Sequence, residues 1–240
     1  MTTPMVEVAS LTKRFGSVDI LRGVDVTIAR GRITGIVGPN GAGKSTLIKL
    51  ILGLTRPTSG RILVDGHPVD EDGAYRARIG YMPQMGRFPE HLTARELFDT
   101  MHEVRGRDVE VDDDLVGVLS LQDQLDKPLR TLSGGTRQKV NACLALRFSP
   151  ALVILDEPTA GLDPRSSALL KDAVLSLRSS GVTTIVASHV MSELEELCDD
   201  IVFLLDGRVC YTGPISDLHG LTRQANLERA VAALMIREVA

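Results

Sequence analysis

The chain has 240 residues, of which 43% are hydrophobic and 24% charged, so it is neither a disordered nor a collagen-like chain. Its 27 lysine and arginine residues against 31 acidic residues give a formal net charge of −4, without the basic footprint of a free nucleic-acid binder. We therefore expect a globular protein with no nucleic-acid partner.

Cysteine usage and hydropathy indicate the compartment. Cys143, Cys198 and Cys210 are an odd set without metal-ligand spacing, which is typical of buried thiols in a reducing compartment. The N-terminal stretch lacks the basic and apolar regions of a secretory signal. The longest apolar runs, such as 152–155 and 201–205, are far shorter than the ~18 residues of a membrane span. We predict a cytoplasmic chain that reaches a membrane only through a partner.

Two kinds of strand pattern occur along the chain. Residues 6–8, 24–28 and 61–64 alternate polar and apolar side chains, which predicts half-exposed strands, and Asp65-Gly66 predicts a hairpin turn after the third. Three further runs are apolar almost throughout, as in strands of a parallel sheet that helices cover on both faces; they are 33–37, 152–155 and 183–187.

Helical patterns alternate with these strands and predict an α/β core. One pattern covers 47–54, and a second begins after Asp163-Pro164, a cap followed by proline, and ends near Gly181. The stretch 86–135 contains a capping box at Thr93 and reads as a helical insertion. The tail, about 222–238, predicts an amphipathic helix that packs on its own domain or on a partner. We expect one domain over 1–240.

A phosphate-binding loop follows the first apolar strand. The pattern G-x-x-x-x-G-K-[ST] is formed by Gly38, Pro39, Asn40, Gly41, Ala42, Gly43, Lys44 and Ser45, with Thr46 next. Glycines allow backbone N–H groups to converge on phosphate oxygens, and the following helix N-terminus favours negative charge. Lys44 is placed to reach the outer phosphates, and the Ser45 hydroxyl to bind Mg²⁺. The sequence therefore predicts a nucleotide site.

Two acidic residues end the apolar strand 152–155. A carboxylate at the end of a strand beside a phosphate loop is where such proteins hold Mg²⁺, so we assign Asp156 to the metal. We expect the adjacent Glu157 to polarise the attacking water as a general base.

The segment Leu132-Ser133-Gly134-Gly135 lies between the phosphate loop and this acidic pair. This order of motifs resembles the ATP-binding subunits of ABC transporters, and the resemblance covers nearly the whole chain. It implies a P-loop NTPase (RecA-like) α/β core with a mostly parallel sheet, an antiparallel β subdomain and an inserted helical subdomain.

The resemblance also assigns roles to single residues. Phe15 stands where the family stacks an aromatic ring, usually Tyr, on adenine, and Gln84 fits the glutamine loop that touches Mg²⁺. Asp163 fits a loop that links two sites, and His189 fits a switch histidine at the γ-phosphate. Ser133, Gly134 and Gly135 match the signature motif, whereas Thr136 stands where Gln is commonest, which puts its fine contacts in doubt.

The resemblance further implies a shared site. Ser133, Gly134 and Gly135 of one subunit close over the ATP held by another, so a second copy or a paralogue is expected, together with a transmembrane permease driven through about 85–104. The chain looks exporter-like (ABC-2 type) and also resembles the ATPase of nitrous oxide reductase maturation. A soluble, non-transport ABC-type ATPase of translation or DNA repair is the alternative.

Overall fold

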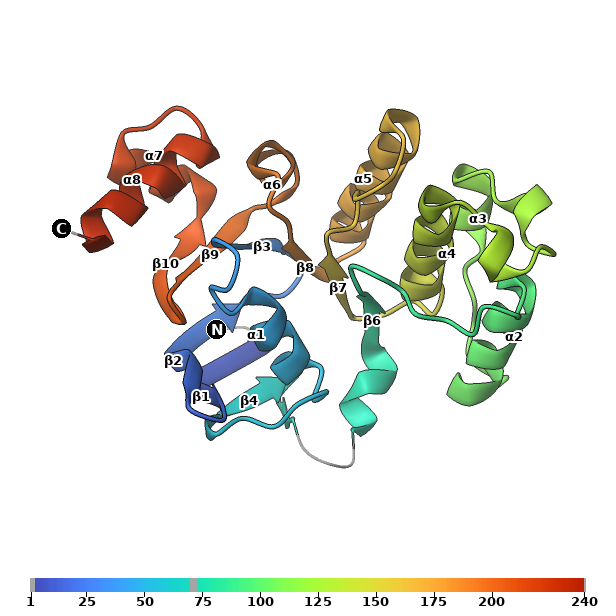
Figure 1. The fold of residues 1–240 in the computed structure, drawn as a ribbon, viewed down its shortest axis with the longest axis horizontal. Coiled ribbons are helices and arrows are strands. Elements are labelled where there is room, and N and C mark those ends of the chain that lie inside the picture. The colour runs from blue at the N-terminus through green and yellow to red at the C-terminus, as the bar shows by residue number, and fades with distance from the viewer. Residues whose placement is uncertain (1–2, 70–72, 240) are drawn as a thin grey trace.

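A computed structural model describes residues 3–69 and 73–239. The two ends of the predicted domain (1–2 and 240) and residues 70–72 lie outside the described residues. The described chain forms two sheets flanked by helices (Figure 1). A four-stranded sheet has the order β2-β1-β4-β5, and a six-stranded sheet has the order β10-β9-β3-β8-β7-β6. This α/β architecture confirms the predicted fold class.

The strands of the six-stranded sheet are β3 (Ile33–Val37), β6 (Ile79–Met82), β7 (Leu152–Asp156), β8 (Thr183–Ala187), β9 (Asp200–Leu205) and β10 (Arg208–Pro214). All neighbours pair in parallel except β10, which is antiparallel to β9. Strands β3 and β8 are buried at every residue, as their unbroken apolar sequences predict. Strands β6, β9 and β10 were not predicted as strands. Strand β6 is short, and β10 is half-exposed without strict alternation.

The antiparallel sheet consists of β1 (Val6–Phe15), β2 (Val18–Ile28), β4 (Ser59–Val64) and β5 (His67–Pro68). The strands predicted over 6–8 and 24–28 correspond to the start of β1 and the end of β2, which pair with each other. Beyond Val8 the register shifts and Ser10 has φ 48°, a bulge that ends the alternation while the strand continues. Asp65 and Gly66 both have positive φ, 54° and 79°, as a tight hairpin requires, so the predicted turn is confirmed.

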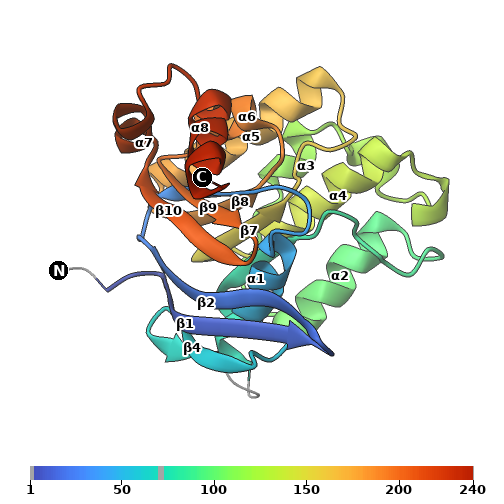
Figure 2. The same ribbon diagram turned by 60° about the vertical axis from the view of Figure 1, so that its left-hand side comes forward.

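Helices cover the parallel sheet on both sides. They are α1 (Lys44–Ile51), α2 (Ala94–Arg105), α3 (Asp114–Val118), α4 (Gly134–Leu146), α5 (Pro164–Ser179), α6 (Met191–Leu197), α7 (Ile215–Thr222) and α8 (Leu227–Val239), with 3₁₀ turns η1 (Ala74–Arg78), η2 (Gln122–Gln124) and η3 (Leu129–Thr131). Helix α1 lies between the two sheets, whereas α4 to α8 cover the other face (Figure 2). Successive residues of β3 point to opposite faces: Ile36 belongs to the hydrophobic core on the α1 side, and Val37 to the core on the side of α4 to α8.

Helix boundaries differ from those expected at two places. Helix α1 begins at Lys44 and ends at Ile51, not over 47–54, because the loop glycine Gly43 caps it directly. The tail helix expected over 222–238 begins at Leu227, because Arg223 adopts φ 55° and ends a separate helix, α7. The capping box that opens α2 is confirmed: the Glu96 N–H donates to Thr93 Oγ1 at 3.1 Å, and the Thr93 N–H donates to Glu96 Oε2 at 2.8 Å.

The three cysteines are free thiols. Cys143 and Cys198 are buried, as expected, and burial raises the pKa of Cys143 to about 12. Cys210 is only half-buried, so the expectation of a buried thiol is wrong there, because β10 lies at the edge of its sheet. Over residues 3–69 and 73–239, we find no helix with the length and apolar character needed to cross a membrane.

Candidate nucleotide site

The loop 38–43 connects the end of β3 to the first turn of α1, which confirms the expected strand–loop–helix setting. Gly43 caps α1 with φ 106°, a conformation that favours glycine. A Cβ atom added there would lie 2.6 Å from Leu21 Cδ2, and one added to Gly38 would lie 2.2 Å from the Leu204 carbonyl oxygen. Only glycine therefore lets the loop pass this close to β2 and β9.

Lys44 is the first residue of α1, and its side chain folds back over the loop. The Nζ atom donates to the Gly38 carbonyl at 2.6 Å and to the Pro39 carbonyl at 3.1 Å. Burial lowers the pKa of Lys44, while the nearby Glu157 and Asp156 carboxylates oppose that shift. The ammonium group is thus held at the mouth of the loop, with neutral carbonyls as its partners.

The loop borders a cavity of about 260 Å³ at the carboxyl ends of the parallel strands. The structure brings there Asn40, Gly41, Gly43, Lys44, Ser45, Thr46, Gln84, Asp156 and Glu157, together with Ile20. Burial and the adjacent Glu157 raise the pKa of Asp156, and the charges of Lys44 and Lys49 only partly oppose this shift. The hydroxyl, amide and carboxylate oxygens of Ser45, Gln84 and Asp156 form a donor set that suits a hard cation such as Mg²⁺.

Glu157 and His189 meet where β7 and β8 end. Glu157 has φ 52°, and its N–H donates to the Ala187 carbonyl at 2.8 Å. Its Oε2 atom lies 2.8 Å from His189 Nδ1 and accepts from the Ser188 hydroxyl at 3.4 Å. Since a carboxylate only accepts, His189 donates from Nδ1 and turns Nε2 outward. The glutamate is buried and the histidine largely exposed, as a pair facing an incoming ligand would be.

The signature residues lie outside this cavity. Ser133 caps α4, where its hydroxyl accepts from the Thr136 N–H at 3.1 Å. Gly134 lines a different cavity, of about 640 Å³, to which Gln84 also contributes. Among the described residues that border the phosphate-loop cavity, Ser133, Gly134 and Gly135 do not occur. Within one chain, therefore, the two predicted halves of the site stay apart.

Phe15 and Asp163 are also outside the cavity lining. Phe15 ends β1 with 52% of its surface exposed, and Lys13 Nζ lies 4.5 Å from the centre of its ring. Asp163 caps α5 and accepts from both the N–H and the hydroxyl of Ser166, at 3.0 and 2.6 Å. These hydrogen bonds lower the pKa of Asp163 to about 2.

The Asp163 cap leads to a pH-dependent stability. Because its pKa is lowered from 3.8 to about 2, the cap stabilises the folded chain above pH 4 and loses this effect as the pH falls toward 2. We expect the wild type to unfold at higher urea than Asp163→Asn near neutral pH. The difference in urea midpoints should shrink on acidification, and a difference that grew below pH 4 would contradict the assignment.

Sequence reasoning missed two buried amides on α4. Asn141 Nδ2 donates to the Pro83 carbonyl at 2.8 Å, and Gln138 Nε2 lies 3.3 Å from the Glu157 carbonyl and 3.4 Å from that of Pro158. These two side chains lie three residues apart on the helix face that packs toward the site. Polar residues at helical spacing between apolar neighbours were the available signal, although they equally suit an exposed face.

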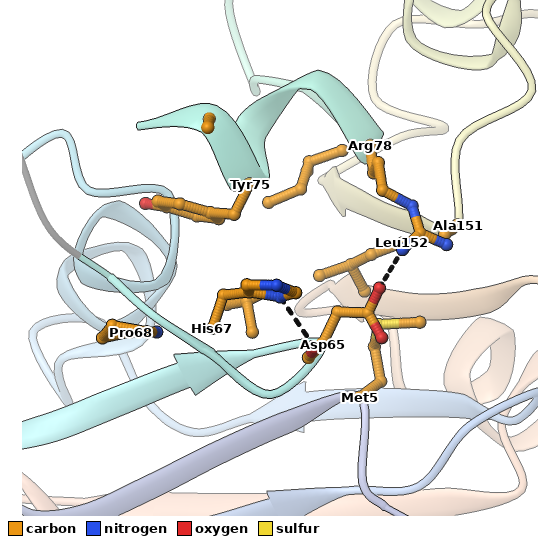
Figure 3. A pocket seen from close by; sticks show the side chains of 11 residues that line it. Met5, Asp65, His67, Pro68, Tyr75, Arg78, Ala151 and Leu152 are labelled. Carbon is orange, nitrogen blue, oxygen red and sulfur yellow. Dashed lines mark hydrogen bonds and ion pairs between the residues drawn. The ribbon is translucent and has the colours of Figure 1, made fainter. Parts of the chain in front are cut away.

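Another cavity, of about 300 Å³, lies at the opposite ends of β6 and β7 (Figure 3). The Tyr75 and His67 rings flank it, and an ion pair between Arg78 and Asp65 closes one end. Hydrogen bonding from Arg30 lowers the pKa of Asp65. Its lining, within the described part of the chain, includes none of the predicted site residues, so we do not assign the nucleotide to it.

A parallel α/β sheet, a glycine loop that opens a helix, and a carboxylate pair at the end of β7 together define a P-loop nucleotide-binding ATPase. The family model of the ABC transporter matches residues 21–160. The chain belongs to the ABC transporter family, as the motifs implied.

Curated relatives are named as ATP-binding proteins of export or of drug resistance. The chain is 38% identical over 85% of its length to Nod factor export ATP-binding protein I of Rhizobium meliloti (strain 1021), and covers 63% of that protein. It is 37% identical over 92% of its length to daunorubicin resistance ATP-binding protein DrrA3 of Streptomyces coeruleorubidus, and covers 72% of it. This chain therefore spans about two thirds of the length of these relatives.

Solved structures agree with this family. An ATP-binding subunit of an ABC transporter superposes with a TM-score of 0.89 at 29% identity, covering 96% of this chain and 99% of that one. A dimeric ATP-binding cassette in a post-hydrolysis state with ADP and Pi gives 0.80 at 26% identity, covering 88% and 99%. The fold is that of an ABC cassette.

Proposed function

We propose that this chain binds and hydrolyses ATP as a subunit that powers a separate membrane-spanning transporter subunit through ATP-driven dimerisation. The observation that carries the proposal is that Ser133, Gly134 and Gly135 lie outside the phosphate-loop cavity of their own chain. The site of one chain is therefore incomplete. In this proposal the chain is one ATP-binding domain, with 86–135 as its helical subdomain.

The phosphate loop supplies the binding half of the site. Backbone N–H groups of Asn40 to Ser45 and the N-terminus of α1 hold the phosphates, and Lys44 exchanges its loop carbonyl partners for phosphate oxygens. Phe15 stacks on adenine from the end of β1, where its ring is exposed. Thr46 completes the polar wall of the cavity.

Glu157 and His189 act on the attacking water and the γ-phosphate. Glu157 accepts the proton of the water, because its carboxylate faces the loop and is held by His189. His189 turns its free Nε2 toward the γ-phosphate. Ser45, Gln84 and Asp156 hold Mg²⁺, which when bound neutralises charge on the transferred phosphoryl group. Asp163 lies in the loop that links the two sites of a dimer.

A second copy, or a close paralogue, supplies the missing half of each site. The N-terminus of its α4, capped by Ser133, points backbone N–H groups of Gly134 and Gly135 at the γ-phosphate. A two-fold pair then closes both sites in one isologous interface. The pair is stable while the γ-phosphate bridges both chains, and hydrolysis shifts the population toward the open form.

The transporter subunit docks beside the helical region. A cavity of about 250 Å³ lies there between Leu54, Tyr81, Met101 and Phe148. Val104, next to the lining residue Arg105, is 74% exposed, and Met85, which lines the cavity of about 640 Å³, is 69% exposed. Exposed apolar side chains around a hollow are typical of protein interfaces. We place the chain in the cytoplasm, at the inner face of the membrane, bound to this permease. Relatives named for Nod factor export and for daunorubicin resistance favour an exporter over a soluble translation or repair factor.

The dimer requirement can be tested by the concentration dependence of ATP hydrolysis. With saturating Mg²⁺ and ATP, the rate per chain is expected to rise with protein concentration and then level off as dimers form. Light scattering on the same samples checks the oligomeric state. Full activity in a demonstrated monomer, unchanged on dilution, would refute the shared site.

A further inference from the structure

A single buried amide connects helix α4 to the backbone of Glu157. The Gln138 residue is 7% exposed, and its Nε2 atom donates to the carbonyls of Glu157 and Pro158 at 3.3 and 3.4 Å. Both acceptors belong to the peptide units that follow strand β7. The Glu157 carbonyl also accepts from the Ala160 N–H at 3.2 Å, so the amide gives it a second donor and ties the Glu157 and Pro158 carbonyls to α4.

The Glu157 backbone needs such support. At φ 52° it occupies a sparsely populated region for a residue other than glycine, which persists only where the surroundings over-determine it. From the side of β8, the Ala187 carbonyl accepts the Glu157 N–H at 2.8 Å. From the other side, Gln138 Nε2 and the Ala160 N–H both donate to the Glu157 carbonyl. These contacts hold opposite ends of the same residue, and Gln138 is the one that comes from α4.

Helix α4 also packs closely on the loop that follows Glu157. A Cβ atom on Gly135 would lie 2.8 Å from the Gly161 carbonyl oxygen, so the helix start and this loop are in direct contact. The loop is fixed on its far side as well, where the Thr159 hydroxyl donates to Glu193 Oε2 at 2.7 Å. Because the loop is in contact on both sides, we expect a displacement of α4 to be passed on to Glu157.

We propose that Gln138 is a positioning residue for ATP hydrolysis, whose amide holds the Glu157 backbone so that the Glu157 carboxylate stays beside His189. This inference rests on the proposed role of Glu157 as general base. Because α4 begins at the residues proposed to close on the partner's nucleotide, the same amide links that closure to the base of its own chain. Gln138 is not among the described residues that line the phosphate-loop cavity, so it acts through Glu157.

The test replaces the amide in the full chain. Gln138→Met keeps the length of the side chain but removes both donors, and Gln138→Glu turns them into acceptors that repel the two carbonyls. We expect both variants to retain nucleotide affinity and KM for ATP within about twofold, because the phosphate loop is untouched, whereas kcat falls by roughly 10- to 100-fold. A role in stability alone would leave kcat unchanged at temperatures where the variants stay folded.

Two further variants support this test. Gln138→Asn keeps the amide donors but shortens the side chain by one methylene, so it tests the same hydrogen bonds with less disturbance of the core. We expect an intermediate loss of kcat. Thr222→Val is the matched control, since its buried hydroxyl donates to the Leu218 carbonyl at 2.8 Å in α7, away from the site. It should lower the melting temperature without changing kcat.

The outcomes separate this inference from the proposed function. If Glu157→Gln is inactive but Gln138→Met and Gln138→Asn have the wild-type kcat, the role of Gln138 is overturned and that of Glu157 stands. Normal turnover by Glu157→Gln would overturn the base and, with it, this inference. A loss confined to KM in the Gln138 variants would also overturn it, because misplacing a base does not weaken ATP binding.

Discussion

Replacing Lys44 with alanine is expected to lower kcat/KM for ATP by roughly 100-fold or more, since a preorganised charged donor aimed at the phosphates is lost. The ammonium group now lies on the loop carbonyls of Gly38 and Pro39, within reach of the cavity. Equilibrium binding of a fluorescent ATP analogue and steady-state phosphate release measure the two contributions separately.

The matched control is Lys127→Ala, which removes the same charge from an exposed position whose Nζ donates to Gln124 Oε1 at 3.0 Å. Its nucleotide affinity should equal that of the wild type. Unchanged turnover in Lys44→Ala would remove Lys44 from the proposed site.

Glu157→Gln is expected to separate binding from hydrolysis. Glutamine keeps the size of the side chain but cannot take a proton from water, so turnover should fall by roughly 10²- to 10⁴-fold. ATP affinity should be retained, because the phosphate loop and Lys44 are intact. The uncleaved nucleotide should then hold two chains together, and size-exclusion chromatography with ATP should resolve a dimer that is absent without nucleotide.

Wild-type protein run in ATP and in ADP is the control, because hydrolysis should return it to the monomer. A Glu157→Gln variant that binds ATP and stays monomeric would count against the two-fold pair, unless a paralogue is needed to form it. Adding candidate partner chains to the same column separates these two cases.

The local motifs of the nucleotide site could be predicted because each depends on short-range chemistry. The glycine spacing of 38–43 marks a tight turn before a helix, and the run 152–155 followed by Asp156 marks a strand that ends in a carboxylate. The structure brings these segments to one cavity, together with Gln84. Their roles in catalysis stay predictions until the substitutions above are made.

The rest of the sheet was harder to predict. Strand β6 is four residues long and β10 is half-exposed, so neither has a strong pattern of its own. Each is stabilised as a strand by pairing with its neighbour: β6 with β7, which is distant in the sequence, and β10 with β9 across a short turn. Propensity over a short window does not include that contribution.

The sequence by itself determined the family of this protein, its α/β core and the residues of the phosphate loop, because these depend on glycine, charge and hydrophobic patterns within a few residues. Only the tertiary structure decided that Ser133, Gly134 and Gly135 lie apart from that loop, that His189 meets Glu157 at 2.8 Å, and that Gln138 holds the Glu157 backbone. The two contacts join residues 19 and 32 positions apart in the sequence. They arise from the packing of α4 and β8 around β7, and no local pattern encodes that packing.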